Sequence, residues 1–206
     1  MLGLEKIFSK LNTHETEPTY LLVGLGNPGR EYRGNRHNVG FMVIDHLGQD
    51  WGVRLSKVQA RALIGLGRYL GHKIILAKPQ TYMNLSGQSV SSLMRFYKLP
   101  LENLLVIHDD LDLPLGTIRL RPSGGSAGQK GLNSIIQQLG TQNFARLRIG
   151  IGRPPGRMDP ADYVLQNFSN EEQEMLTMVL GRAEEAVQGF LHLGLEQTMS
   201  RFNGAV

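Results

Sequence analysis

Apolar residues follow two different spacings along the chain from residue 19 onward. Short unbroken apolar runs predict buried strands at residues 20–24 and 104–107, and residues 147–151 predict a further strand. Apolar residues spaced three and four positions apart predict helices at residues 39–51, 86–98 and 132–139. Because these strands and helices alternate along the chain, the pattern indicates an α/β fold in which helices cover a sheet.

Leu70-Gly71-His72 has the composition of a turn, and a short segment with strand character lies on each side of it. Residues 62–69 and 73–77 flank this turn, and together they predict a β-hairpin. Residues 117–121 alternate between apolar and polar side chains, which is typical of an edge strand or a half-exposed strand.

The C-terminal part of the chain predicts one long helix. Ser169 and Glu172 have the spacing of a capping box, and Gly194 ends the helix after about Leu193. With 206 residues, the chain is long enough for one domain with a substantial core. We therefore expect a single α/β domain over residues 19–206, with a twisted mixed, largely parallel sheet and helices on both faces.

The first 18 residues differ in character from the rest of the chain. They contain a few apolar residues with helical spacing, followed by a polar segment that is typical of a linker. The segment has no long apolar stretch of the kind found in secretory signals. We predict an N-terminal extension over residues 1–18, either disordered or a short helix.

Composition narrows the possible environments and chemistries. The chain has no cysteine, which excludes disulfides and thiolate metal ligands. It also has no apolar run long enough to cross a bilayer. The sequence therefore favours a cytoplasmic protein without a membrane partner.

The excess of basic over acidic residues lies in one segment, although the net charge of the chain is only +4. Between Leu113 and Met158 there is no Asp or Glu. The basic residues of this segment are Arg119, Arg121, Lys130, Arg146, Arg148, Arg153 and Arg157. Guanidinium groups match phosphate geometry, so the segment favours a nucleic-acid or nucleotide partner. A solvated charged face is the alternative interpretation.

A glycine-rich segment, Gly24-Leu-Gly-Asn-Pro-Gly29, follows the first predicted strand. Its spacing matches the dinucleotide-binding motif, which requires a helix to begin at the third glycine. Residues 30–36 are polar and lack helical periodicity, so the match is weak. We interpret the segment as a rigid turn that presents the Asn27 amide at the carboxyl end of a strand, with a plain loop as the alternative.

Two further segments contain single polar residues near helix starts. His37 stands before the predicted helix at 39–51, where it is either a candidate base or an ordinary surface histidine. Asn84 lies in the segment from Lys78 to Gly87, in a position that predicts a helix N-cap.

The remaining two segments offer charged or backbone groups. His108-Asp109-Asp110-Leu-Asp112 leaves a buried strand, and its carboxylates are candidates either for a divalent cation or for holding a histidine or a loop. The loop from Ser123 to Gly131 precedes a helix whose backbone N–H groups suit an anion. It is not a Walker loop, because the Gly-Lys-Ser/Thr ending is missing.

Taken in order, five blocks resemble the bacterial-type peptidyl-tRNA hydrolases. The blocks are LLVGLGNPGREY, RHNVGF, LAKPQTYMNLSG, HDDLDLPLG and the stretch from GGSAG to ARLRIGIGRP. The resemblance implies hydrolysis of the ester between a peptide and the 3′ end of tRNA, which recycles tRNA from peptidyl-tRNA released by stalled ribosomes. It also implies peptidyl-tRNA as the partner, a monomer, and no metal or organic cofactor.

The resemblance also assigns roles to individual residues. His37 would activate water, Asp109 would orient His37, and Asn27 would complete the catalytic group. The substrate-binding residues that it implies are Tyr32, Met83, Asn84, Gln129 and Lys130, and the tRNA phosphate contacts are Arg119, Arg121 and Arg148. One departure stands out, because most members carry a His-Asn pair where this chain has Gln129-Lys130. A glutamine does not titrate near neutral pH, so Gln129 is not a general base.

Two other functions are compatible with parts of the sequence. The basic segment and the Gln129-Lys130 pair fit an RNA-binding protein that has lost hydrolysis, although His37 and Asp109 are both present. The glycine motif fits a nucleotide-dependent oxidoreductase, but the expected helix start is missing. Because no Ser-His-Asp constellation is apparent in the sequence, we favour direct attack by water over an acyl-enzyme.

Overall fold

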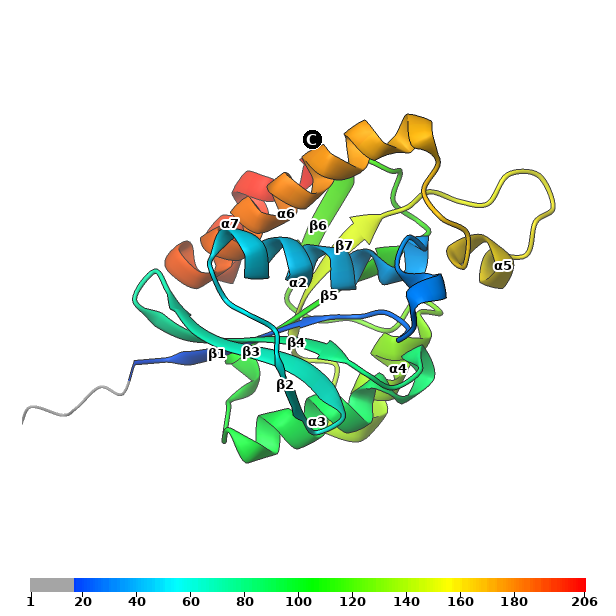
Figure 1. Cartoon of the computed structure of the whole chain (residues 1–206). Coiled ribbons are helices and arrows are strands. Elements are labelled where there is room, and N and C mark those ends of the chain that lie inside the picture. The colour runs from blue at the N-terminus through cyan, green and yellow to red at the C-terminus, as the bar shows by residue number, and fades with distance from the viewer. Residues whose placement is uncertain (1–16) are drawn as a thin grey trace, which may run out of the picture.

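The fold is one mixed sheet with helices packed on both of its faces (Figure 1). The structure, a computed structural model, describes residues 17–206. The strands of this described part are β1 (Thr19–Gly24), β2 (Lys57–Gln59), β3 (Ala62–Tyr69), β4 (His72–Pro79), β5 (Leu104–Asp110), β6 (Thr117–Arg121), β7 (Ala145–Gly150) and β8 (Gly204–Ala205). Their order in the sheet is β2-β3-β4-β1-β5-β7-β6-β8.

The parallel part of the sheet is its centre. β1 pairs in parallel with β4 and with β5, and β5 pairs in parallel with β7. The pairings toward both edges, β2-β3-β4 on one side and β7-β6-β8 on the other, are antiparallel. The predicted mixed sheet is confirmed, and the carboxyl ends of its central strands meet at one edge, where α/β proteins bind ligands.

Helices and single helical turns connect the strands. The α-helices are α2 (Val39–Asp50), α3 (Ser86–Phe96), α4 (Lys130–Leu139), α5 (Pro160–Val164), α6 (Gln173–Leu193) and α7 (Leu195–Phe202). The short 3-10 turns are η1 (Arg30–Tyr32), η2 (Arg36–Asn38), η3 (Met83–Leu85), η4 (Leu101–Asn103) and η5 (Asn170–Glu172).

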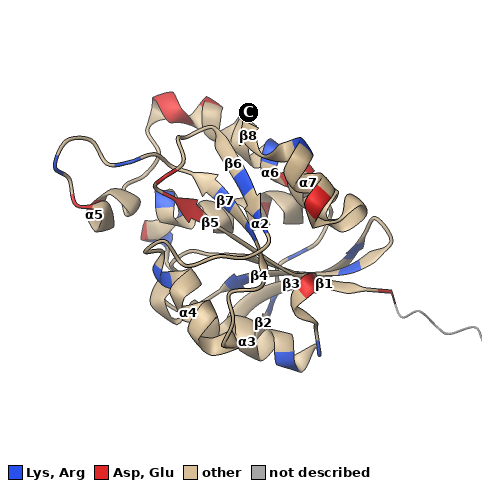
Figure 2. Ribbon diagram, turned by 180° about the vertical axis from the view of Figure 1, so that it is seen from behind, with Lys and Arg blue, Asp and Glu red and all other residues tan. Residues whose placement is uncertain are grey.

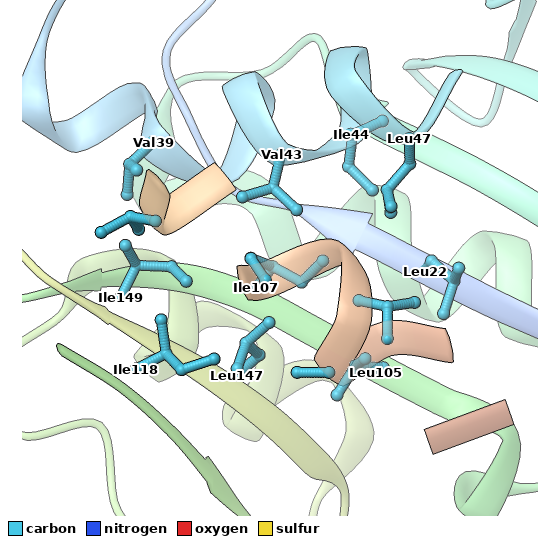
Figure 3. Close-up of a cluster of buried hydrophobic side chains, with 14 of the residues drawn as sticks. Leu22, Val39, Val43, Ile44, Leu47, Leu105, Ile107, Ile118, Leu147 and Ile149 are labelled. Carbon is cyan, nitrogen blue, oxygen red and sulfur yellow. The ribbon is translucent and has the colours of Figure 1, made fainter. Parts of the chain in front are cut away.

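Two hydrophobic clusters fill the spaces on either side of the sheet. Alternate residues of β1 separate between them: Leu22 belongs to the cluster under α2 and α6, and Leu21 to the cluster that includes α3 and α4. Figure 3 shows the first cluster, in which side chains of α2 meet those of β5 and β7. This alternation follows from the two-residue period of a strand, and it confirms helices on both faces.

Close backbone packing fixes where α2 begins. A Cβ atom added to Gly40 would lie 2.4 Å from the carbonyl oxygen of Ile107 and 2.5 Å from the backbone nitrogen of Leu25. Only glycine therefore allows the first turn of α2 to pack directly on the ends of β1 and β5. The result is that η2, which precedes α2, lies beside the carboxyl end of β5.

Most predicted elements are confirmed, and the capping-box prediction holds as well. The backbone N–H of Ser169 donates to Oε2 of Glu172 at 2.7 Å, just before α6. The pattern missed β2, α5, α7 and β8, which are short elements with few fully buried apolar side chains. Nearly all of the predicted extension, residues 1–18, lies outside the described residues. Within residues 17–206, no helix has the length and apolar character to span a membrane.

Candidate active site

A cleft of about 1160 Å³ opens at the carboxyl edge of the central strands. It collects residues from the ends of β1 and β5, from η2 and η3, and from the loop before α4. Among the catalytic, substrate-binding and tRNA-contacting residues that the resemblance implies, those that line it are Asn27, His37, Met83, Asn84, Asp109, Gln129 and Lys130. Segments that are far apart in the sequence therefore meet in one site.

His37 and Asp109 form the central contact of this cleft. Nδ1 of His37 lies 2.7 Å from Oδ2 of Asp109, and both residues are buried. An ionised carboxylate accepts hydrogen bonds but does not donate them, so Nδ1 carries the proton and Nε2 keeps its lone pair. A histidine in this tautomer can accept a proton from water at Nε2.

The surroundings of Asp109 keep its carboxylate ionised. Burial by itself raises the pKa of Asp109, but the charge and hydrogen bond of His37 and the hydrogen bond of Gln129 outweigh it. The pKa of this carboxyl is therefore below its ordinary value.

Asn27 is held with its amide group fixed in orientation. Oδ1 of Asn27 accepts the backbone N–H of Met83 at 2.9 Å. The backbone of Asn27 exchanges two hydrogen bonds with the side chain of Asn38, both at 2.9 Å. Because Oδ1 is already engaged, Nδ2 is the group that remains to donate to a ligand. The rigid-turn interpretation of this segment agrees with these contacts, which tie the turn to η2 and η3.

The helix N-cap prediction for Asn84 is wrong. Asn84 lies inside η3, and the residue at the N-cap position of α3 is Leu85, which makes no side-chain cap bond. A 3-10 turn precedes α3 and contains Asn84, while α3 itself begins at Ser86, as its apolar pattern indicates. Asn84 is exposed and lines the cleft.

Gln129 links the glycine-rich loop to the contact between His37 and Asp109. It is the N-cap of α4, where its Oε1 accepts the backbone N–H of Leu132 at 2.7 Å. Its Nε2 donates to Oδ1 of Asp109 at 3.0 Å. The neighbouring Lys130 is exposed and lines the same cleft.

The acidic residues of the segment 108–112 do not converge on a common point. Asp109 bonds His37, Asp110 pairs with Arg148, and Asp112 pairs with Arg153. Of the two interpretations of this segment, the contacts favour the one in which the carboxylates hold a histidine and a loop. Within residues 17–206, the ligand atoms that cluster as they would around a metal ion belong to His46, Asp50 and Glu184, none of which lines the cleft.

The arginines of β6 and β7 differ in how far they are buried. Arg119 on β6 lies opposite Arg148 on β7, and the end of β5 with Asp110 is close by (Figure 2). Arg121 is exposed, whereas Arg146 is buried and donates to backbone carbonyl groups of the glycine-rich loop. Arg146 therefore has a structural role, which charge counting alone does not separate from a surface role.

Four of the expected contacts lie outside the cleft walls. Arg119, Arg121 and Arg148 belong to the neighbouring strands β6 and β7. Tyr32 lies on η1, is half-buried, and does not belong to the described cleft walls. Asn38, which anchors Asn27, was not expected, because its contact depends on the folding of η2 against the first turn.

The glycine motif after β1 does not open a helix. Gly29 has φ 122°, and α2 begins only at Val39. The feature that the dinucleotide-binding motif requires is therefore missing, which argues against the oxidoreductase interpretation.

The sequence is similar to one known protein family over most of its length. The family model described as peptidyl-tRNA hydrolase matches residues 21–206. A peptidyl-tRNA hydrolase of Caldanaerobacter subterraneus is 50% identical over 185 residues, which cover 90% of this chain and all of the relative. The chloroplastic peptidyl-tRNA hydrolase of Arabidopsis thaliana is 47% identical over 196 residues, covering 95% of this chain and 68% of the relative.

A solved structure gives the same result at the level of the fold. The crystal structure of peptidyl-tRNA hydrolase from Acinetobacter baumannii superposes with a TM-score of 0.85 at 37% identity. The superposition covers 91% of this chain and 95% of that one. On the match of nearly the whole described fold and sequence, the chain belongs to the peptidyl-tRNA hydrolase family.

Proposed function

We propose that this chain hydrolyses the ester between a peptide and the 3′ end of tRNA by attack of a water molecule that His37 activates. The observation that carries this mechanism is the buried contact of 2.7 Å between His37 Nδ1 and Asp109 Oδ2. It leaves the lone pair of Nε2 free to take a proton from water, which is what a general base must do.

The chemical steps balance with His37 alone as the proton carrier. Nε2 takes a proton from water as the oxygen attacks the ester carbonyl. The tetrahedral intermediate then collapses, the bond to the ribose oxygen breaks, and Nε2-H returns the proton to that oxygen. The charge of Asp109 stabilises the imidazolium that exists between these two steps.

Asn27 supplies the hydrogen-bond donor for the developing negative charge. Its Oδ1 accepts from the Met83 backbone, which directs Nδ2 toward the substrate. A donor of fixed direction is worth more than a mobile one, because it needs no reorganisation during the reaction. Removal of one such donor costs about 3 kcal/mol in the transition state.

Asn84 is the candidate reader of the peptide group, with Met83 beside it. Peptidyl-tRNA carries an amide where aminoacyl-tRNA carries a charged amine. An exposed amide side chain in the cleft favours the first, because a misplaced ammonium group loses hydration without compensation. The side chains of the peptide matter little in this arrangement, so substrates of varied sequence are accepted.

The tRNA is held through its phosphates beside the cleft. Arg119, Arg121 and Arg148 on β6 and β7 are the candidate contacts, and Lys130 and Tyr32 are candidate contacts nearer the 3′ end. Phosphate contacts position a nucleic acid without reading its bases, which suits an enzyme that acts on many tRNAs. The proposed working form is a monomer, in which one chain supplies the whole site.

The test compares wild type with His37→Ala on an N-acetylaminoacyl-tRNA, with chelator present, and follows release of free tRNA. We expect turnover to fall by about 10²- to 10⁴-fold, while tRNA affinity stays within about twofold. His192→Ala is the matched control, because His192 is exposed on α6 outside the cleft. A small loss of turnover in His37→Ala contradicts the mechanism. Tight tRNA binding without hydrolysis by the wild type supports the RNA-binding alternative.

A further inference from the structure

Gln129 makes two hydrogen bonds that face in opposite directions. Oε1 accepts the backbone N–H of Leu132 inside the first turn of α4, at 2.7 Å. Nε2 donates to Oδ1 of Asp109 at 3.0 Å and lies 3.3 Å from the sulfur of Met83. Because His37 bonds Oδ2 of the same carboxylate, both oxygens of Asp109 are held from different elements.

We propose that Gln129 is a positioning residue of the reaction, which fixes the carboxylate plane of Asp109 and so aims His37 Nε2 at the attacking water. The proposal rests on the role of His37 as the base. It replaces the expectation that Gln129 contacts the substrate, because both ends of its amide are already engaged within the protein.

The amide has only one orientation that satisfies both partners. The Leu132 N–H requires an acceptor, and the ionised Asp109 requires a donor, so Oε1 and Nε2 cannot exchange places. A carboxylate held at one oxygen can rotate, whereas one held at both oxygens keeps its plane. Correct alignment of a base within a few tenths of an ångström determines much of its effect on the rate.

A neutral amide also keeps the site free of an additional ionisation. The other titratable or charged side chains around the pair are Arg36 on η2, His108 and Asp110 on β5, Lys130 on α4, and Asp112, Arg153 and Asp159 across the cleft. Gln129 itself contributes no charge at any pH, so a charge placed there changes the electrostatics of His37 in a known direction.

The decisive variant is Gln129→Glu. Its carboxylate can still accept the Leu132 N–H, but an oxygen now faces Oδ1 of Asp109 in place of the donor. We expect kcat at neutral pH to fall by about tenfold or more while KM stays within about twofold, as for loss of a hydrogen bond to a charged group. The added negative charge also favours the imidazolium form of His37, so the acid limb of the kcat profile should move to higher pH.

Two further variants separate positioning from simple stability. Gln129→Leu removes both bonds and should lower kcat together with the melting temperature. Gln129→His should retain most of the wild-type kcat, because a neutral imidazole has one acceptor and one donor nitrogen. The matched control is Gln138→Glu, which makes the same change at an exposed position of α4 and should leave kcat and the pH profile unchanged.

The outcomes distinguish this proposal from the general mechanism. If Gln129→Glu and Gln129→Leu keep the wild-type kcat and acid limb while His37→Ala is inactive, the positioning role is wrong and the mechanism stands. If the Gln129 variants raise KM at constant kcat, Gln129 is a substrate contact and the proposal is overturned. If His37→Ala is fully active, the proposed mechanism itself fails, whatever the Gln129 variants show.

Discussion

Single residues in this site are specified by contacts between segments that are distant in sequence. His37 and Asp109 are 72 positions apart, yet they meet at 2.7 Å because Gly40 lets α2 begin against the end of β5. Burial of Asp109 is tolerated because His37 and Gln129 satisfy its two oxygens. The charge of Asp109 then favours the His37 tautomer with its proton on Nδ1, which the proposed mechanism needs.

Asp109→Asn should lower kcat by about 10²- to 10⁴-fold with little change in tRNA affinity. In the wild type, Nε2 of Gln129 donates to Oδ1 of Asp109. The amide of the variant must therefore turn its oxygen toward Gln129 and its N–H toward His37. An N–H group facing Nδ1 forces the proton of His37 onto Nε2. Nε2 then has no lone pair with which to take a proton from water. Single-turnover kinetics and tRNA binding check this, and near-normal kcat contradicts it.

His108 should make the protein less stable in mild acid. It is buried on β5, and burial lowers its pKa against the opposing effect of Asp109. The unfolded chain therefore binds a proton that the native state does not, and the free energy of unfolding falls as pH drops below about 6.5. His108→Gln should reduce this pH slope in urea unfolding between pH 7 and 5. The exposed His192→Gln should not, and equal slopes in all three proteins contradict the argument.

The sequence predicted the candidate catalytic residues better than the residues that hold them in place. His37, Asp109 and Asn27 stand in motifs that resemble those of a known family, so their place in the cleft was expected. The roles of Asn38, Gln129 and Arg146 were not predictable, because each depends on which backbone groups the fold brings within hydrogen-bond distance. Local sequence patterns do not indicate such hydrogen-bond partners.

At the scale of secondary-structure elements, apolar spacing predicted the helices and strands that bury a continuous face. α2 and β5 each place several side chains in a core, so their periods are clear in the sequence. β2 is largely exposed, and α7 has one fully buried residue, Thr198. Elements held mainly by their neighbours leave a weak pattern, which is why they were missed.

The packing of α2 on β5 provides a direct test at this scale. Gly40→Ala places a methyl group 2.4 Å from the Ile107 carbonyl oxygen, so we expect destabilisation by more than about 2 kcal/mol and a lower kcat as η2 shifts. The matched control is Gly181→Ala on α6, where nothing lies within 4 Å of the new methyl. It should stabilise by about 0.5–1 kcal/mol, since alanine favours helices. Comparable effects of both variants in urea unfolding contradict this view.

At the scale of the whole molecule, charge and shape are arranged around one edge of the sheet. The chain carries a net charge of +4, and its excess of basic over acidic residues lies in the segment that supplies β6 and β7. Figure 2 shows these basic strands beside the acidic carboxyl end of β5. A basic surface next to the cleft fits the proposed substrate, whose reactive bond is at the end of a nucleic acid.

Arg119→Ala should weaken tRNA binding and reduce the slope of log affinity against log salt by about 1. The physical reason is the loss of one phosphate contact and the counterion that it releases. Arg68→Ala is the matched control, because Arg68 is exposed on β3 near the end that lies away from the cleft. Titrations at several salt concentrations measure both slopes, and an unchanged slope in Arg119→Ala removes Arg119 from the interface.

The pH dependence of the single-turnover rate, for wild type and His37→Ala with saturating enzyme, is the decisive test of whether His37 activates the water. We expect the wild-type rate to rise with pH through one ionisation and then to level off. We expect His37→Ala to lose this acid limb and to react about 10²- to 10⁴-fold more slowly on the plateau. An acid limb that persists in His37→Ala, with a plateau within tenfold of wild type, would show that another group activates the water.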